Sequence, residues 1–221
     1  MPPYIPQEGE LSTLEPDSIR SCFLANFATE SRKSTETNIT VKLNIDGEGK
    51  AKIDTGIGFL DHMLELFAFW GLFDLEITTF SADLKVDNHH TNEDLGIVLG
   101  KAFKKALGDK AGINRIGFAA APMENVTANV NVDLSGRGSF QWELPAMCVA
   151  QKGYKAEYAE HFFEALAKQL GMNLNVKIDN PSKDLHATLE PVFKALGIAL
   201  DKATQVDPRR KGVPSTKGII D

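Results

Sequence analysis

Residues 89–93 read His-His-Thr-Asn-Glu, and residues 186–190 read His-Ala-Thr-Leu-Glu. Each of these segments is preceded by another histidine that follows an acid, Asp61-His62 in the first half and Glu160-His161 in the second. All five histidines of the chain belong to this repeated pattern. The repeat indicates an internal duplication, and it predicts two related metal sites.

Apolar periodicity around the two segments predicts the regular elements of each half. Alternation of apolar and polar residues predicts four strands, over residues 39–45, 75–77, 126–134 and 174–178. Apolar residues at helical spacing predict four helices, at about residues 58–70, 90–107, 156–170 and 187–204. A hairpin is expected near Ser81-Ala82-Asp83, with Leu84 and Val86 on its returning strand. Because alternating strands have one covered face, the pattern favours an α+β fold over a doubly wound one.

The composition excludes several classes of protein. No run of about 18 apolar residues is present, so no membrane partner is expected. The net charge of −6 argues against nucleic acid as a partner, although local basic clusters can still bind a small phosphorylated molecule. Cys22 and Cys148 form no CxxC pair, so neither a zinc knuckle nor a redox motif is predicted. The segment Gly56-Ile57-Gly58 lacks the third glycine of a dinucleotide-binding loop.

The repeated histidines and glutamates have the spacing of metal ligands. His89 and Glu93 are four residues apart on a predicted helix, as are His186 and Glu190, so each pair shares one face. His90 points about a third of a turn away, which suits a second ion or one held by another subunit. Imidazole with carboxylate favours Mn, Fe or Zn over Ca or Mg. A single helical histidine is more often structural than a ligand, so the metal prediction depends on the repetition.

Five longer motifs connect the chain with a known family. They are residues 56–64 (GIGFLDHML), 87–94 (DNHHTNED), 133–137 (DLSGR), 160–163 (EHFF) and 214–218 (PSTKG). Together they closely resemble imidazoleglycerol-phosphate dehydratase of histidine biosynthesis, and residues 207–210 (DPRR) look most like its plant-type members. The resemblance covers about residues 32–220 in order and with few gaps. The chain is therefore identified as a divergent member of this family.

The resemblance implies a fold, a cofactor and a reaction. The fold would be α+β, with two duplicated βαβ-containing halves, each a sheet with helices packed on one face. The assembly would be a homo-oligomer, a 24-mer in the family, with active sites at subunit contacts and two Mn²⁺ ions per site. The reaction would remove water from imidazole glycerol phosphate, a small phosphorylated imidazole substrate, and give imidazole acetol phosphate. In it, metal acts as a Lewis acid and a carboxylate moves the proton.

Carried over position by position, the resemblance also assigns site residues. One metal site would comprise His62, His90, His186 and Glu190, and the other His89, Glu93 and His161. Glu36 matches a substrate-contacting acid and joins Glu93 and Glu190 as a catalytic carboxylate. The substrate-binding residues that hold the phosphate would be Arg115, Arg137, Lys194, Ser215 and Lys217, whose side chains suit a phosphate.

Four positions depart from the family pattern. Ala187 stands where the family has a second paired histidine; in a shifted alignment His186 takes that second place and Leu185 the first. In both alignments one metal site has one imidazole fewer. Trp70 replaces a histidine that contacts substrate, and residues 123–125 read Met-Glu-Asn in place of Met-Asp-Glu. Pro191 either lies inside the last helix, where it removes a backbone hydrogen bond, or is the first residue of a helix that starts there.

These departures leave three interpretations open. The leading one is an Mn-dependent dehydratase, a hydro-lyase weakened by the lost site residues. The second is a non-catalytic or substrate-shifted homologue that keeps metal for subunit assembly. The third is an unrelated metal-dependent hydrolase, which ranks last because neither HExxH nor GxSxG is present.

The same reading divides the chain into four parts. They are an N-terminal tail or arm (1–30), a first repeat half (31–117), a second repeat half (118–207) and a C-terminal phosphate-binding tail (208–221). The first residues lack the basic start and apolar stretch of a secretory signal. The predicted location is the cytoplasm, with a plastid as the alternative if a transit segment has been removed.

Overall fold

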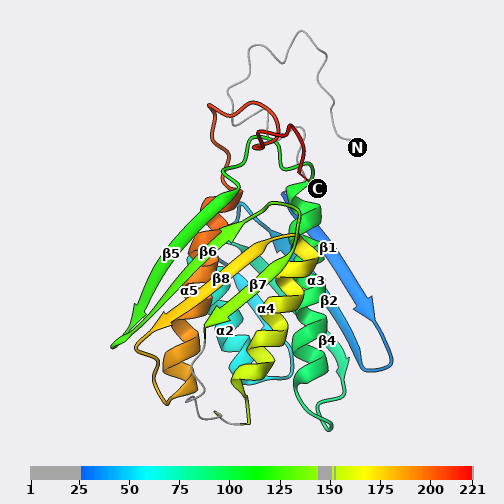
Figure 1. The fold of residues 1–221 in the computed structure, drawn as a ribbon. Helices are drawn as coiled ribbons and strands as arrows, with labels where there is room; N and C mark the ends of the chain where they lie inside the picture. Colours follow the sequence, from blue (N-terminus) through cyan, green and yellow to red (C-terminus); the bar gives the residue numbers. More distant parts are fainter. Residues whose placement is uncertain (1–25, 144–150, 152, 221) are drawn as a thin grey trace.

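Two four-stranded sheets and four helices form the computed structural model, which describes residues 26–143, 151 and 153–220 (Figure 1). The first half contains β1 (Phe27–Lys33), β2 (Thr37–Asn44), β3 (Ala51–Asp54), α2 (Gly58–Gly71), β4 (Asp74–Ala82) and α3 (His89–Leu107). The second half contains β5 (Ile116–Met123), β6 (Val126–Asp133), β7 (Ser139–Glu143), α4 (Ala156–Leu170), β8 (Asn173–Asp179) and α5 (Leu185–Thr204). The second half repeats the element order of the first.

The two sheets also share one topology. Their strand orders are β1-β2-β4-β3 and β5-β6-β8-β7. In each sheet the last two strands are parallel and are connected by a helix, α2 between β3 and β4, and α4 between β7 and β8. The prediction of an α+β fold with two duplicated βαβ-containing halves is therefore confirmed.

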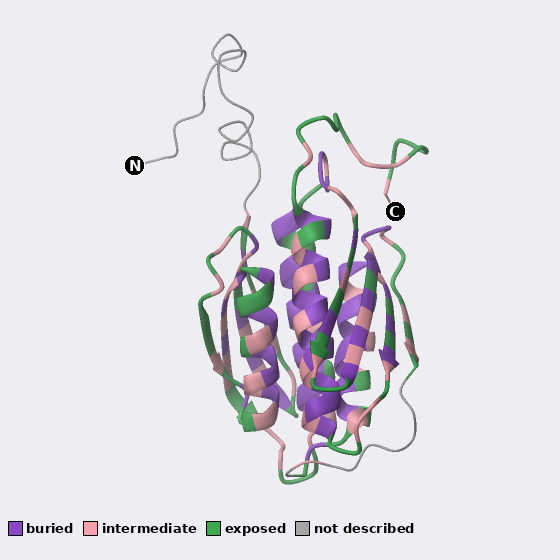
Figure 2. Ribbon diagram, turned by 90° about the vertical axis from the view of Figure 1, so that its left-hand side faces the viewer, coloured by how far each residue is buried: buried purple, intermediate pink, exposed green. Residues whose placement is uncertain are grey.

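The helices lie between the two sheets, and their packing crosses from one half to the other. Helices α2 and α3 contact the first sheet, and α4 and α5 contact the second. Between these layers α3 packs on α4, and α2 packs on α5, around a buried core (Figure 2). The first helix of each half therefore packs on the second helix of the other half. None of the described helices has the length and apolarity needed to cross a membrane.

Two glycines mark equivalent crossing points in the helix pairs. A Cβ atom added at Gly100 of α3 would lie 2.8 Å from the carbonyl oxygen of Leu166 on α4. A Cβ atom added at Gly197 of α5 would overlap the carbonyl oxygen of Phe67 on α2. Gly100 follows Glu93 by seven residues, and Gly197 follows Glu190 by seven. The two halves therefore align here without gaps.

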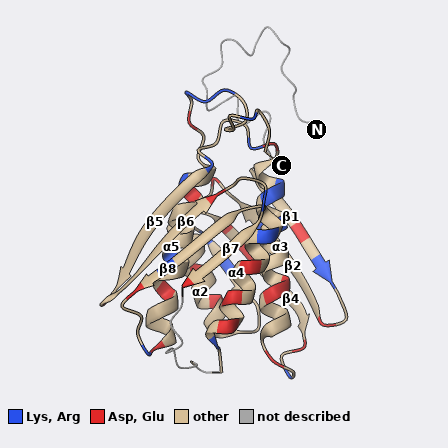
Figure 3. Cartoon of the chain, in the orientation of Figure 1, with Lys and Arg blue, Asp and Glu red and all other residues tan. Residues whose placement is uncertain are grey.

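The C-terminal segment after α5 lies against the loop that joins the two halves. The amides of Gly112 and Asp207 donate to the carbonyls of Gly212 and Gly112, at 2.8 and 2.9 Å. Lysines and arginines gather on this segment and on the last turns of α3, at the upper end of the molecule in Figure 3. A basic region therefore lies at this end of the molecule, over the C-terminal segment and the carboxyl end of α3.

The structure corrects the sequence prediction at three places. Residues 84–86 form a turn, closed by the Val86 amide on the Asp83 carbonyl at 2.8 Å, so the predicted hairpin is wrong. Strand β1 begins at Phe27, so residues 27–30 belong to the sheet and not to a tail; residues 1–25 lie outside the described part. Strand β5 begins at Ile116, two residues before the predicted start of the second half.

We predict that Gly197→Ala lowers the free energy of unfolding by about 1–3 kcal/mol, because the new methyl group would push α5 away from α2. Gly58→Ala is the control, since no heavy atom lies within 4 Å of a Cβ at that helical position. It should change stability by less than about 1 kcal/mol. Urea unfolding measures both values, and equal effects of the two substitutions would contradict the packing described here.

Candidate active site

The first turns of the four helices bring all five histidines to one end of the molecule, the lower end in Figure 1. His89 and His90 begin α3, and His186 is the second residue of α5. His62 and His161 follow within the first two turns of α2 and α4. Since the helices of each packed pair run parallel, these histidines meet in two groups.

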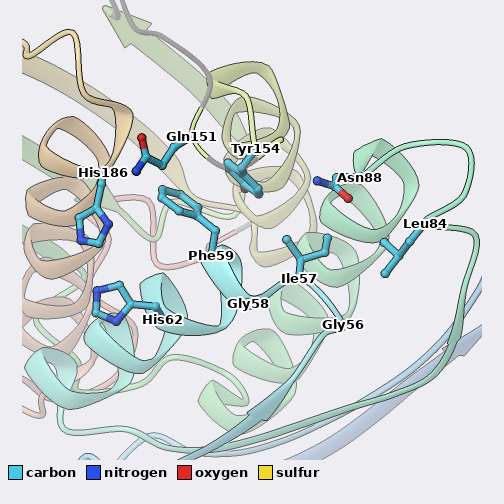
Figure 4. Close-up of a pocket in the computed structure, with 10 residues that line it drawn as sticks. All are labelled: Gly56, Ile57, Gly58, Phe59, His62, Leu84, Asn88, Gln151, Tyr154 and His186. Atoms are coloured by element: carbon cyan, nitrogen blue, oxygen red, sulfur yellow. The ribbon is translucent and has the colours of Figure 1, made fainter.

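The first group comprises His62, His186 and Glu190. The Oε2 atom of Glu190 lies 2.9 Å from Nε2 of His186 and 3.6 Å from Nε2 of His62. The two rings face each other from different helices, with centroids 5.2 Å apart (Figure 4). Among the described residues, this is the only set of three whose potential ligand atoms all lie within 4.8 Å of one another. Two imidazoles and a carboxylate at these separations could hold a metal ion.

Glu190 is held in its ionised form. Its side chain is only 13% exposed, and its Oε1 atom lies 2.5 Å from Nζ of Lys194. Burial alone would raise the pKa of Glu190, but hydrogen bonds from Lys194 and His186 outweigh it and lower that pKa below its ordinary value. Glu190 is therefore a carboxylate, the form that binds a cation.

Local structure keeps His186 and Glu190 on one face of α5. The Asp184 side chain caps the helix by accepting a hydrogen bond from the His186 amide at 2.9 Å, so α5 begins at Leu185. Pro191 consequently lies inside the helix and does not start it. Its missing N–H removes the usual helical partner of the Ala187 carbonyl, but the contact between His186 and Glu190 remains.

The second group comprises His89, Glu93 and His161. The Nε2 atom of His89 lies 3.4 Å from Oε2 of Glu93, and the rings of His89 and His161 have centroids 4.0 Å apart. All three residues line a cavity of about 330 Å³ between α3 and α4. The glycine alignment makes this group the counterpart of the first, so each group combines helices from both halves.

His90 lies apart from the first group, to which the resemblance assigns it. Its Nδ1 atom is 2.8 Å from Oδ2 of Asp83, and its Nε2 atom is 3.7 Å from Oε1 of Glu36. The hydrogen bond to Asp83 raises the pKa of His90 above its ordinary value, and the nearby charges of Asp83 and Glu36 add to that shift. A single subunit does not place His90 beside His62, so its role there stays a prediction.

Arg115 lies at the opposite end of the molecule. Its Nε and Nη2 atoms donate to the carboxylate of Asp133 at 2.6 and 3.0 Å, and its Nη1 donates to the Pro214 carbonyl at 3.0 Å. The Arg115 amide also donates to the carbonyl of Ala203, in the last turn of α5. The 17 residues from His186 to Ala203 span about 25 Å along this helix. Arg115 is therefore far from the first histidine group.

The other predicted phosphate residues divide between the two ends. Ser215 lines a cavity of about 430 Å³ with Arg115, and its hydroxyl accepts a hydrogen bond from the Lys217 amide at 3.2 Å. Arg137 is exposed in the loop between β6 and β7, at the same end. Lys194 instead contacts Glu190 at the histidine end. One subunit therefore does not gather all five residues around one phosphate.

The structure adds residues that sequence reasoning missed. A cavity of about 610 Å³ beside His62 and His186 is lined by Phe59 and Tyr154, whose rings stack with centroids 4.7 Å apart (Figure 4). Tyr154 is buried, and its hydroxyl donates to Oδ1 of Asn92 at 2.5 Å. Asn92 could have indicated a buried polar contact in the sequence, because it is a polar residue on the apolar face of a predicted helix.

Trp70 does not reach the cavity beside His62. It follows His62 on α2 by eight residues, or about 12 Å along the helix. Its side chain is 45% exposed and packs edge-on against Phe69, which is also exposed. Within one subunit, Trp70 therefore leaves the first histidine group unobstructed.

We predict that Arg115→Lys loosens the C-terminal segment, because a single ammonium cannot replace the guanidinium contacts to both Asp133 and the Pro214 carbonyl. The free energy of unfolding should fall by about 1–3 kcal/mol, and amide exchange over residues 210–217 should become faster. Arg209→Lys is the control, since the Arg209 side chain pairs with Asp207 inside the segment and with no other residue in the described part of the chain. Unchanged exchange in Arg115→Lys would contradict the anchoring role.

Comparison with known proteins relates this geometry to one family. The family model described as imidazoleglycerol-phosphate dehydratase matches residues 55–200. The imidazoleglycerol-phosphate dehydratase of Geobacillus thermodenitrificans is 49% identical over 199 residues, which cover 89% of this chain and 100% of that protein. The one of Thermoanaerobacter pseudethanolicus is 49% identical over 189 residues, which cover 86% and 96%. Both relatives are bacterial, so the plastid location gains no support.

Solved structures lead to the same family. The enzyme of Pyrococcus furiosus, in complex with (S)-C348, has a TM-score of 0.73 at 33% identity and covers 86% of this chain and 99% of its own. The imidazoleglycerol-phosphate dehydratase of Staphylococcus aureus has a TM-score of 0.70 at 30% identity, with 82% and 99% covered. With the duplicated fold and the matched motifs, these similarities show that the chain belongs to the imidazoleglycerol-phosphate dehydratase family.

Proposed function

We propose that the chain catalyses the Mn-dependent dehydration of imidazole glycerol phosphate to imidazole acetol phosphate, a hydro-lyase step of histidine biosynthesis. Family membership supports the reaction, since relatives that match nearly the whole chain carry the dehydratase name. The observation that carries the proposal is the pair of histidine–carboxylate groups at equivalent places in the two halves.

The donor atoms of the two groups fit manganese. His62, His186 and Glu190 would hold one ion, and the second group, His89, Glu93 and His161, would hold the other. Each group offers two imidazoles and one carboxylate and leaves positions open, a set that favours Mn, Fe or Zn over harder cations. Bound Mn²⁺ would supply Lewis-acid chemistry at the imidazole ring of the substrate. Neither group uses position 187, so the alanine there removes no donor from a group formed within one chain.

Glu36 is proposed as the carboxylate that moves a proton on the substrate. Dehydration removes one hydroxyl and one carbon-bound proton from the substrate side chain, so a group that accepts and returns a proton is needed. The Glu36 side chain is 46% exposed, and its Oε1 atom lies 3.7 Å from Nε2 of His90. It is therefore accessible to a ligand at the histidine end of the molecule.

The separation of the predicted residues supports an oligomeric site. Arg115, Ser215 and Lys217 lie about 25 Å from the first histidine group along α5, farther than a small phosphorylated imidazole can reach. A second subunit that brings its basic end to this subunit's histidine end would complete the site. We therefore propose a homo-oligomer, a 24-mer as in the family, with active sites at subunit contacts. No nucleic acid or membrane partner is part of the proposal.

The non-catalytic alternative is not favoured. It was motivated by the missing histidine at position 187 and by Trp70, and neither residue disturbs the histidine groups within one subunit. Both histidine groups retain three potential ligands, Trp70 stays outside the cavity beside His62, and Pro191 leaves the contact between His186 and Glu190 intact.

We predict that the Mn-loaded protein converts imidazole glycerol phosphate to imidazole acetol phosphate, with about two Mn²⁺ per subunit. Glu190→Gln should lose about one Mn²⁺ per subunit and at least tenfold in turnover, because an amide is a weaker ligand than a carboxylate. Glu76→Gln, a partly exposed position that pairs with Lys42 and Lys52 on the first sheet, is the matched control and should change neither value. Metal analysis and a product assay on the same samples measure both.

Either of two results would count against this function. Full metal content without turnover would favour the non-catalytic homologue. Equal metal loss in Glu190→Gln and Glu76→Gln would remove the first group as a specific metal site.

A further inference from the structure

The turn that carries Glu36 is closed by its own residues. The Ser34 amide donates to the Thr37 carbonyl at 2.8 Å. The Ser34 hydroxyl accepts hydrogen bonds from the amides of Glu36 and Thr37, at 3.2 and 3.0 Å. This turn, residues 34–37, joins β1 to β2, and these bonds set its shape but not its position relative to α3.

A buried carboxylate on α3 ties both flanks of the turn to that helix. The Asp94 side chain is 6% exposed. Its Oδ1 atom accepts a hydrogen bond from Nε of Arg32 at 2.6 Å, and its Oδ2 atom accepts one from the hydroxyl of Thr37 at 2.5 Å. Arg32 precedes the turn and Thr37 ends it, so one side chain holds the turn from both sides.

The anchored turn places Glu36 next to the start of α3. Asp94 lies one turn of helix after His90, and His90 is itself fixed by its 2.8 Å contact with Asp83. The 3.7 Å separation of Glu36 Oε1 and His90 Nε2 therefore depends on two carboxylates that hold the two partners in place. Charge-assisted hydrogen bonds of this kind are among the stronger ones in proteins.

The second half has a turn of equal length at the equivalent place, without this anchor. Strands β2 and β6 have the same burial pattern and align residue by residue, and the turns before them have equal length. The equivalents of Arg32, Glu36, Thr37 and Asp94 are Ala121, Asn125, Val126 and Pro191. The second half closes its hairpin without the anchor. The anchor therefore occurs in the half that carries Glu36, whose equivalent in the second half is Asn125; the acid of the second turn, Glu124, lies one position earlier.

We infer that Asp94 is a positioning residue, which acts through Arg32 and Thr37 to hold the carboxylate of Glu36 in its working place beside His90. This inference rests on the proposed function, in which Glu36 moves a proton on the substrate. An acid on an unanchored turn would sample many positions, and misplacement by about 1 Å can cost a hundredfold in rate. Asp94 therefore acts on turnover rather than on substrate affinity.

Thr37→Val tests the anchor with little change in shape, since valine occupies the equivalent position 126. We predict that kcat falls about tenfold while KM stays within about twofold, because only the placement of the acid changes. Thr37→Ser keeps the hydroxyl and should retain both values. Asp94→Asn should act in the same direction as Thr37→Val. Val126→Thr is the matched control in the second half and should leave kcat unchanged.

A double-mutant cycle and amide exchange separate positioning from general stability. In a Glu36→Gln background, Thr37→Val should cause no further loss of kcat, because the acid it positions is already gone. Amide exchange over residues 34–37 should become several-fold faster in Thr37→Val but not in Val126→Thr, measured on the full chain. The inference is overturned if Thr37→Val keeps its full effect without Glu36, if Thr37→Ser behaves like Thr37→Val, or if exchange in the turn is unchanged.

The outcome separates this inference from the proposed function. An unaltered protein without dehydratase activity would contradict the function, and turn exchange would then decide alone whether Asp94 holds the turn. An active protein whose Glu36→Gln variant loses activity while Thr37→Val retains it would leave the function in place and overturn the role of Asp94.

Discussion

The close packing of α3 on α4 and of α2 on α5 is the constraint on which the candidate site depends. Each pair runs parallel and approaches closely at a glycine, so the first turns of its two helices lie side by side. The histidines occupy those first turns. A helix from one half therefore contributes histidine and glutamate, and a helix from the other half contributes the remaining histidine. Neither half alone can form a group of three.

The sequence predicted the inner part of each sheet and missed its edges. The four predicted strands correspond to β2, β4, β6 and β8, which are paired on both sides. The four missed strands, β1, β3, β5 and β7, are the edges. An inner strand buries one full face and alternates clearly, whereas an edge strand such as β3 (AKID) is mostly exposed and carries a weak pattern. The hairpin predicted near residues 81–83 is wrong because residues 84–86 form a turn, and Leu84 lines the cavity beside His62 instead of continuing a strand.

For the site, contacts between residues of one helix could be predicted from their spacing in the sequence. Contacts between helices of different halves could not. The spacing of His89 and Glu93, and of His186 and Glu190, predicted contacts that the structure contains. The assignment of His62 and His161 to separate groups came from the family resemblance, because it depends on how helices of different halves pack. The role of Asp94 could not be predicted either, because its hydrogen-bond partners Thr37 and Arg32 lie 57 and 62 residues away in the sequence. Comparison of the two halves identifies Arg32, Thr37 and Asp94 as a special feature of the first half, since the equivalent residues of the second half are apolar.

Anomalous diffraction at the manganese edge, from crystals of the full chain grown with Mn²⁺, would test the account most directly. We expect one anomalous peak among His62, His186 and Glu190 and a second at the His89, Glu93 and His161 group. We also expect the basic end of a neighbouring subunit to lie beside them. Peaks at neither group, or an assembly in which no basic segment approaches the histidines, would contradict a metal-dependent site shared between subunits.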